Sequence, residues 1–224
     1  MFISLINSNL KMIDDSLIEM PSFKFPSHYV YWGEVNDHES IKSNVLPVIH
    51  NLLSNNKYEN PFKACTMQTN ISNVSNFLDD ETLEKITVGH FKKMILETDC
   101  MNGKKPTDVI VSEYWFNMYE KGNFQEMHDH TNMPLVIGGK RYDVMFSLIY
   151  ILHDEESTPI LFRLDDPRMP FYPIHSSIDF NTSDVDEIKE GTLLIFSSHL
   201  PHTVLPVKQP GRITIALNIA CCFE

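Results

Sequence analysis

From residue 107 to the end, the sequence consists of short β-branched and aromatic runs separated by turn-forming residues, and this pattern limits the fold most strongly. The first run is DVIVSEYWFNMY, and later runs lie at 144–152, 159–164, 191–198, 202–207 and 212–220. Gly, Pro, Asp and Asn stand between them. Such short strands are typical of an all-β sandwich or barrel. We therefore expect a mainly β core over residues 107–224.

The last run indicates how its strand sits in that core. Successive side chains of a strand point to opposite faces. One face carries only apolar residues, namely Ile213, Ile215, Leu217 and Ile219, and must be buried. The other face carries Arg212, Thr214, Ala216 and Asn218. Because it includes a cation, we expect this second face to line a cavity that holds a ligand.

Two amphipathic segments precede the β region. Residues 37–55 place apolar side chains at helical spacing, with a disturbance near Pro47. A second helix is expected from Asp79–Asp80, whose acids suit a helix N-terminus, to Asn102–Gly103. We expect residues 1–106 to form a helical annex packed on the outer face of one sheet. The 224 residues then form one domain.

Charge and cysteine usage exclude several classes of protein. The formal net charge is −12, so nonspecific binding to nucleic acid is not expected. Cys65, Cys100, Cys221 and Cys222 lack the spacing of a zinc site or a disulfide framework. They indicate reduced thiols in a cytoplasmic protein. No run of about 18 apolar residues suggests a membrane span, and the N-terminus lacks the basic region of a signal peptide.

Three of the ten histidines stand out as metal ligands. His128 and His130 flank Asp129, and residues i and i+2 of an extended chain point the same way. Two imidazoles could then face one metal, although a polar loop with chance histidines gives the same tripeptide. The other histidines considered, namely His28, His38, His50 and His90, are expected to be ordinary surface or core residues.

The third candidate ligand is His202, at the start of a strand that leads through Pro210–Gly211 to Arg212. We expect a hairpin that brings His202 and Arg212 together across adjacent strands. A buried cation facing a cavity needs an anionic partner, which a dicarboxylate on the metal would supply. His199 competes with His202 for the role of ligand.

These motifs resemble those of the prolyl-4-hydroxylase family of iron(II)- and 2-oxoglutarate-dependent oxygenases. Tyr119-Glu-Lys-Gly122 and His128-Asp-His130 resemble the family pattern Y-x-x-G-x(5)-H-x-D. The run 191–196 followed by His202 and Arg212 resembles its G-x-L-x-x-F, distal His and basic residue, and 149–162 resembles its intervening strand pair. WFNMYEKGNFQEMHDH with the later LNI is similar to a subfamily of marine bacteria and their phages that carries H-x-H. The resemblance covers about residues 107–220.

The resemblance implies a double-stranded β-helix, a jelly roll like that of the cupins, with Fe(II), 2-oxoglutarate and O2 as cofactors. His128 and His202 would bind the iron, and Arg212 would pair bidentately with the distal carboxylate of 2-oxoglutarate. Tyr119 could donate a hydrogen bond to the same cosubstrate. Asn117 and Asn218 are further candidates for the cavity wall. The implied reaction hydroxylates a substrate C–H bond and releases succinate and CO2.

His130 departs from the family pattern, which has a carboxylate at this position. Three alternatives stay open at this point: His130 completes a three-His site, Asp129 binds the metal instead, or a water takes the place. The sequence does not identify the substrate, for which a prolyl or peptidyl group is the family-level expectation. We also expect residues 131–143 to form either an ordinary hairpin or a lip from which Lys140 and Arg141 contact the substrate.

Two other functions fit the same residues. A cupin-like three-His dioxygenase would share the fold and the metal, but would have no need of Arg212. A non-catalytic β-sandwich module would bind a ligand without consuming 2-oxoglutarate. The Asn-, Ile- and Lys-leaning composition agrees with a phage-encoded protein expressed in a host cell.

Overall fold

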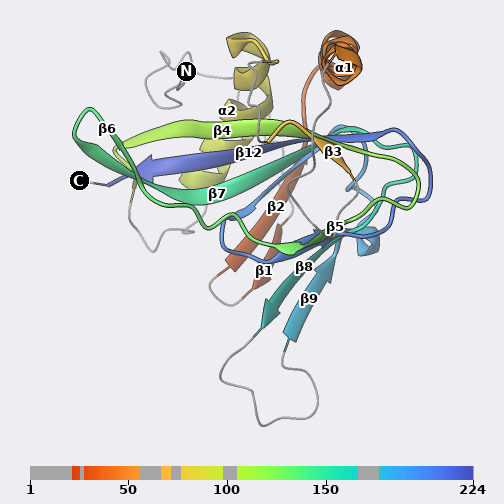
Figure 1. Cartoon of the computed structure of the whole chain (residues 1–224). Coiled ribbons are helices and arrows are strands. Elements are labelled where there is room, and N and C mark those ends of the chain that lie inside the picture. The colour runs from red at the N-terminus through yellow and green to blue at the C-terminus, as the bar shows by residue number, and fades with distance from the viewer. Residues whose placement is uncertain are drawn as a thin grey trace.

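A computed structural model describes residues 22–25, 28–55, 67–71, 77–97, 105–165 and 177–223 (Figure 1). Cys65, Cys100 and the expected helix end at Asn102–Gly103 lie outside these ranges. Cys221 and Cys222 are buried, and neither forms a disulfide among the described residues. Among the helices that the structure describes, none combines the length and the apolar character that a membrane crossing requires.

The larger sheet is antiparallel and contains eight strands. Its order is β1 (Ser22–Phe25), β2 (His28–Glu34), β10 (Thr192–Ser197), β7 (Lys140–His153), β12 (Arg212–Cys222), β4 (Asp108–Tyr119) and β3 (Gln68–Thr69), with β6 (Leu135–Ile137) paired to β7. The three longest strands, β4, β7 and β12, lie side by side at its centre (Figure 1). Each of them carries several β-branched or aromatic residues, which favour a half-buried pleated surface.

A smaller antiparallel sheet faces the larger one. Its order is β5 (Gln125–His128), β11 (His202–Val204), β8 (Ile160–Asp165) and β9 (Ser177–Asn181), and a 3-10 helix η1 (Thr182–Asp184) follows β9. Buried apolar side chains of both sheets, including Ile149, Phe162 and Phe196, form the layer between them. Two antiparallel sheets packed in this way form a jelly roll, which confirms the predicted mainly β fold.

Two helices, α1 (His38–Asn55) and α2 (Asp80–Glu97), cover the outer face of the larger sheet (Figure 1). Ile41 and Ile49 of α1 and Phe91 of α2 belong to the same buried cluster as Ile215 and Leu217 of β12. The apolar face of the last strand is therefore buried beneath the helices, as predicted. The helix α1 continues through Pro47. Asp79 accepts a hydrogen bond from Thr82 N at 2.7 Å and caps α2.

The N-terminal region is not the purely helical annex that the sequence predicts. Strand β2 pairs with β10 from Val30↔Phe196 to Glu34↔Thr192, so this region extends the larger sheet. The segment HYVYWGE is aromatic and β-branched, which is a strand signal. The sequence prediction missed it because the segment stands alone between Pro26 and the first helix.

The expected hairpin between His202 and Arg212 is also wrong. Strand β11 pairs with β5 and β8, whereas β12 pairs with β4 and β7. The seven residues 205–211 cross from one sheet to the other, where Gly211 N donates to Tyr119 O at 3.0 Å. His202 and Arg212 therefore lie on opposite sheets and line one cavity between them.

Candidate metal centre

Three histidines converge at the edge of the smaller sheet. His128 ends β5 and is the direct cross-strand neighbour of His202, which begins β11. His130 lies just beyond β5, where its backbone N–H donates to Ser198 O at 2.7 Å. The ring centroids are 4.2 to 5.2 Å apart. One ring nitrogen of each lies within 4.8 Å of the others, a spacing that could hold one metal ion.

A hydrogen bond at Nδ1 orients each ring. His128 Nδ1 donates to Glu126 O at 2.7 Å, and His202 Nδ1 donates to Leu200 O at 3.1 Å. His130 Nδ1 donates to Asn218 Oδ1 at 2.9 Å. Because a carbonyl oxygen only accepts, each Nδ1 carries the proton and each Nε2 keeps its lone pair. This is the tautomer that metal-binding histidines adopt when a partner holds the other nitrogen.

Burial keeps these imidazoles neutral. Desolvation is the main cause that lowers the pKa of each ring. The neighbouring His128 adds to the effect of burial on His130 and brings its pKa to about 4. The pKa of His202, which is completely buried, lies well below its ordinary value. All three rings are therefore in the neutral form that binds metals at neutral pH.

Behind His130 lies a polar network that the sequence did not reveal. Asn218 Oδ1 accepts from His130 Nδ1 and from Ser147 Oγ at 2.7 Å. Asn218 Nδ2 donates to Glu113 Oε1 at 2.6 Å. Glu113 can only accept, which fixes the amide of Asn218 with its oxygen toward His130. Asn218 therefore does not line the cavity as predicted, but orients a histidine that does.

Two competing ligands lie apart from the cluster. Asp129 is exposed, and its carboxylate accepts a hydrogen bond from Thr131 N at 3.0 Å. His199 is exposed, and its ring packs against His28 with centroids 4.6 Å apart. Within the described residues, the structure groups His128 and His202 with His130 and not with either competitor.

The histidines line a cavity between the two sheets with a volume of about 10 Å³, which is room for about one water molecule. Its walls also include Trp115, Asn117, Tyr119, Gln125, Ile149, Ile160, Val204, Arg212, Thr214 and Ala216. Gln125 spans it, since its Oε1 accepts from Tyr119 Oη at 3.0 Å and its Nε2 lies 3.0 Å from His128 Nε2. A metal ion and a dicarboxylate can enter only if Gln125 turns away. Gln125 lies inside the matching segment WFNMYEKGNFQEMHDH, but at a position to which the resemblance assigns no role.

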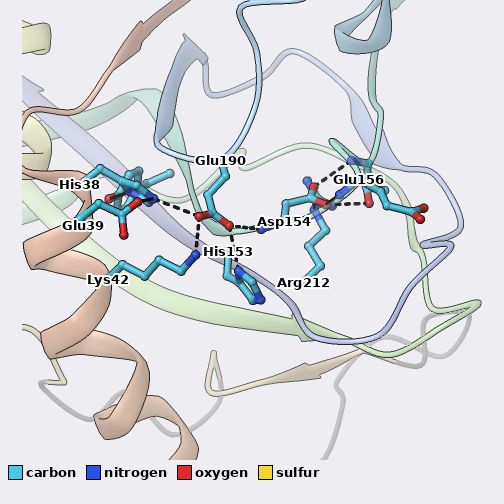
Figure 2. A network of polar contacts seen from close by, with 10 residues as sticks. His38, Glu39, Lys42, His153, Asp154, Glu156, Glu190 and Arg212 are labelled. Atoms are coloured by element: carbon cyan, nitrogen blue, oxygen red, sulfur yellow. Dashed lines mark hydrogen bonds and ion pairs between the residues drawn. The ribbon is translucent and has the colours of Figure 1, made fainter.

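Arg212 is the cation at the far end of this cavity. Its side chain is 1% exposed, and its Nε lies 2.9 Å from Asp154 Oδ2 (Figure 2). The contact lacks hydrogen-bond alignment, and none of the three guanidinium nitrogens has a hydrogen-bond partner among the described residues. The guanidinium also packs over the ring of Tyr119, 5.2 Å from its centroid. A buried guanidinium without acceptors is a ready site for an anionic oxygen ligand.

The remaining predicted residues divide between the cavity and the surface. Asn117 lines the cavity, and its Oδ1 has no hydrogen-bond partner among the described residues. Lys140 and Arg141 lie at the turn between β6 and β7, and neither lines the cavity. Arg141 instead forms an exposed ion pair with Asp143 at 2.7 Å. Residues 131–143 thus contain a paired β6–β7 hairpin, and their role toward a substrate stays a prediction.

A second cluster surrounds Glu190, near Asp154 (Figure 2). His38, Glu39 and Glu190 are close enough to hold a metal ion, but the ammonium of Lys42 already contacts Glu190. Burial alone would raise the pKa of Glu190, but Lys42, the amide of Asp154, His153 and His38 outweigh it and lower the pKa to about 2. The cluster is therefore an ion-pair network that fastens α1 to β7 and the loop before β10.

A larger pocket of about 300 Å³ opens elsewhere on the surface. Its walls come from the turn at 156–159, from 182–188, and from Pro206 and Lys208. It contains none of the predicted site residues, so its size alone does not make it the functional site.

Comparisons with known proteins agree with this arrangement at the level of the fold. No protein-family model matches the sequence, and no curated protein matches it. A viral collagen prolyl hydroxylase from Paramecium bursaria chlorella virus 1, solved with 2-oxoglutarate, is 13% identical, with a TM-score of 0.52 over 86% of this chain and 96% of its own. A Trichoplax adhaerens prolyl hydroxylase, solved with a peptide fragment of hypoxia-inducible factor, is 14% identical, with a TM-score of 0.52 over 87% and 83%.

A third similar structure performs different chemistry on the same fold. The non-haem α-ketoglutarate-dependent epimerase SnoN from nogalamycin biosynthesis is 8% identical, with a TM-score of 0.55 over 85% of this chain and 76% of its own. The chain therefore has the jelly-roll fold shared by these 2-oxoglutarate-dependent enzymes. Identities this low define the fold, and the activity must be argued from the site.

Proposed function

We propose that this protein is a non-haem Fe(II)- and 2-oxoglutarate-dependent oxygenase. The observation that carries the proposal is one cavity with two complementary ends. Three neutral Nε2 atoms converge at one end, and a buried guanidinium without hydrogen-bond acceptors lies at the other. A 2-oxo dicarboxylate has a chelating group for the metal and a distal carboxylate for the arginine. The fold shared with 2-oxoglutarate-dependent enzymes supports this assignment.

In this proposal His128, His130 and His202 hold the iron. Imidazole suits Fe(II), and three protein ligands leave coordination positions open for cosubstrate and oxygen. The outward direction of Asp129 and the oriented Nε2 of His130 favour His130 as the third ligand over Asp129 or water. The metal, when bound, supplies the redox chemistry that activates O2.

The other residues of the cavity bind and orient the cosubstrate. Arg212 pairs with the distal carboxylate, and Tyr119 donates a hydrogen bond to it once Gln125 releases its hydroxyl. Asn117 offers a further polar contact beside Thr214, its cross-strand neighbour. The apolar walls at Ile149 and Ile160 exclude water from the site.

The decisive assay is succinate formation. Protein loaded with Fe(II) and given 2-oxoglutarate and O2 should release succinate slowly even without a substrate, and proton NMR detects it. The His202→Ala variant should give none. Wild-type protein that binds Fe(II) and 2-oxoglutarate but never forms succinate would contradict the proposal and favour a binding module.

As the finer proposal, the substrate is a prolyl or peptidyl group, in which a C–H bond becomes hydroxylated. The similar Trichoplax enzyme, which was solved with a peptide, supports this choice. Mass spectrometry of proline-containing peptides should show the gain of one oxygen atom. If only small molecules gain oxygen, the peptide proposal is wrong and the oxygenase proposal stands.

One observation favours a second candidate, a cupin-like three-His dioxygenase that does not use 2-oxoglutarate. The ligand cluster consists of three histidines, without the usual carboxylate. Such an enzyme has no use for Arg212. Oxygen consumption that is independent of 2-oxoglutarate and unchanged in Arg212→Met would favour this candidate.

A further inference from the structure

Asp154 makes an unusual contact with Arg212. Both side chains are almost completely buried, at 3% and 1% exposed, and Asp154 Oδ2 lies 2.9 Å from Arg212 Nε. Yet this nitrogen has no aligned hydrogen bond, and neither do Nη1 and Nη2. Asp154 thus compensates the charge of Arg212 without directing its donors. A residue that positions an arginine would do so through directional hydrogen bonds.

Asp154 is held in place independently of Arg212. Its carboxylate accepts from Thr158 N at 2.8 Å, from Thr158 Oγ1 at 3.3 Å and from Glu156 N at 3.3 Å. Its backbone N–H donates to Glu190 Oε2 at 2.9 Å, and Glu190 is held in turn by Lys42 and His153 (Figure 2). The carboxylate is therefore fixed, and the long side chain of Arg212 is the partner that can turn toward a ligand.

The Arg212–Asp154 contact affects the net charge of the cavity. A divalent ion on three neutral histidines contributes two positive charges, and the Arg212–Asp154 pair contributes none. A dianion then makes the buried site neutral. In an H-x-D site the one negative charge of the protein lies on a carboxylate that binds the metal. Here His130 replaces that carboxylate with a neutral ring, and the negative charge lies instead on Asp154, next to Arg212.

We propose that Asp154 is a resident counter-ion that competes with the distal carboxylate of the cosubstrate for Arg212, and so weakens cosubstrate binding. The inference rests on the proposed function. A buried arginine without a partner is strongly unfavourable. Asp154 therefore stabilises Arg212 while no cosubstrate is bound, and the ligand must displace an existing ion pair in order to bind.

The test is isothermal titration calorimetry of nickel-loaded protein with 2-oxoglutarate. Asp154→Asn keeps an oxygen that can accept from Thr158 and removes the charge. The dissociation constant of this variant should fall by about tenfold or more, because one like charge a few ångströms from the ligand carboxylate is gone. Asp154→Ser, which also keeps a turn-forming oxygen, serves in its place if circular dichroism shows that the asparagine variant is unfolded.

A ligand without the distal carboxylate separates competition from general loosening. Binding of 2-oxobutanoate, which cannot reach Arg212 with an anion, should be nearly unchanged in Asp154→Asn. Two variants are matched controls. Thr158→Val removes the hydroxyl that donates to Asp154 and leaves the charge of the site unchanged. Asp179→Asn removes a carboxylate that pairs with Arg163 at the protein surface. Both should bind 2-oxoglutarate like wild type.

The opposite result is equally informative. Equal or weaker binding of 2-oxoglutarate by Asp154→Asn would overturn the inference, because Asp154 would then position Arg212 instead of competing for it. Wild-type protein that takes up nickel but does not bind 2-oxoglutarate would instead overturn the proposed function itself. The two failures are therefore distinguishable in one set of titrations.

Discussion

At the scale of single residues, the proposed role of His130 as a metal ligand depends on groups that would not themselves contact the metal. Asn218 can orient His130 only while its amide oxygen faces the ring, and Glu113 holds the amide that way round. Partners of this kind typically contribute 10–100-fold to metal affinity. The same role could not be seen in the sequence, because Glu113 and Asn218 meet only through the pairing of β4 with β12.

Glu113→Gln should therefore weaken metal binding. The glutamine can donate as well as accept, so the amide of Asn218 is no longer fixed and can present its NH2 group to His130. We expect nickel affinity to fall about 10-fold or more, with the fold unchanged. Competition titration against a chromophoric chelator measures it. Glu84→Gln on the exposed face of α2 is the control, and equal affinity of both variants would refute the role of Glu113.

The choice between His199 and His202 gives a second residue-scale prediction. His202→Ala should reduce metal affinity by more than about 100-fold, which exceeds the loss of an orienting partner. His199→Ala should leave it unchanged, because His199 lies on the surface against His28. Competition titration against the chromophoric chelator measures the metal affinity of both variants. Strong binding by His202→Ala would remove this residue from the ligand set.

Local motifs thus predicted some site residues and not others. His128, His130, Tyr119 and Arg212 stand in short patterns, and the structure places all four at the cavity together with His202. Asp154 and Gln125 lie inside two of the matching segments, but the resemblance assigns them no role, and only the tertiary fold brings them to Arg212 and His128. Their roles depend on contacts between segments that are distant in the sequence, and the spacing of residues along the chain does not predict such contacts.

At the scale of elements, Glu190 fastens the helical layer to the sheet. It lies just before β10 and contacts Lys42 of α1 and His153 of β7. Its pKa is lowered to about 2, whereas an unfolded glutamate titrates near 4.5. A depressed folded pKa adds stability that is present above the unfolded pKa and is lost as the pH falls toward the folded pKa.

Glu190→Gln should consequently lower the free energy of unfolding at pH 7 by roughly 1–2 kcal/mol, after allowance for solvent screening. The difference from wild type should shrink between about pH 4.5 and pH 2. Urea unfolding at several pH values measures it. Glu39→Gln is the control, since the Glu39 side chain is 87% exposed. A difference that does not change with pH would contradict the ion-pair account.

Elements with strong periodicity were predicted well, and their partners were not. The spacing of apolar residues predicted both helices and the long strands, because burial of one face depends on local sequence. The entry of β2 into the larger sheet and the placement of β11 and β12 on opposite sheets depend on distant pairings. A jelly roll sends consecutive strands to alternate sheets, so neighbours along the chain are poor guides to neighbours in space.

At the scale of the whole molecule, the site joins the two sheets. The histidine end is attached to β5 and β11, and the arginine end to β12. A metal ion with a dicarboxylate would connect both sheets, so ligand binding should stabilise the entire fold. Binding to the folded state alone adds about 2.7 kcal/mol at a ligand concentration of 100 Kd.

Nickel with 2-oxoglutarate should thus raise the Tm by roughly 5–10 °C for a chain of this length. Differential scanning fluorimetry measures the shift, and EDTA should reverse it. The His202→Ala variant should show no shift. A shift of equal size in that variant would mean that the ligands bind elsewhere.

The central claim is that one cavity binds a metal ion through three histidines and a dianion through Arg212. Anaerobic titration of the Fe(II)-loaded protein with 2-oxoglutarate tests it most directly, because chelation of iron by a 2-oxo acid produces a visible charge-transfer band. The account predicts a saturable band in wild type that is absent in His202→Ala and needs far more 2-oxoglutarate in Arg212→Met. Wild-type protein that binds Fe(II) yet shows no band at any concentration would contradict the account.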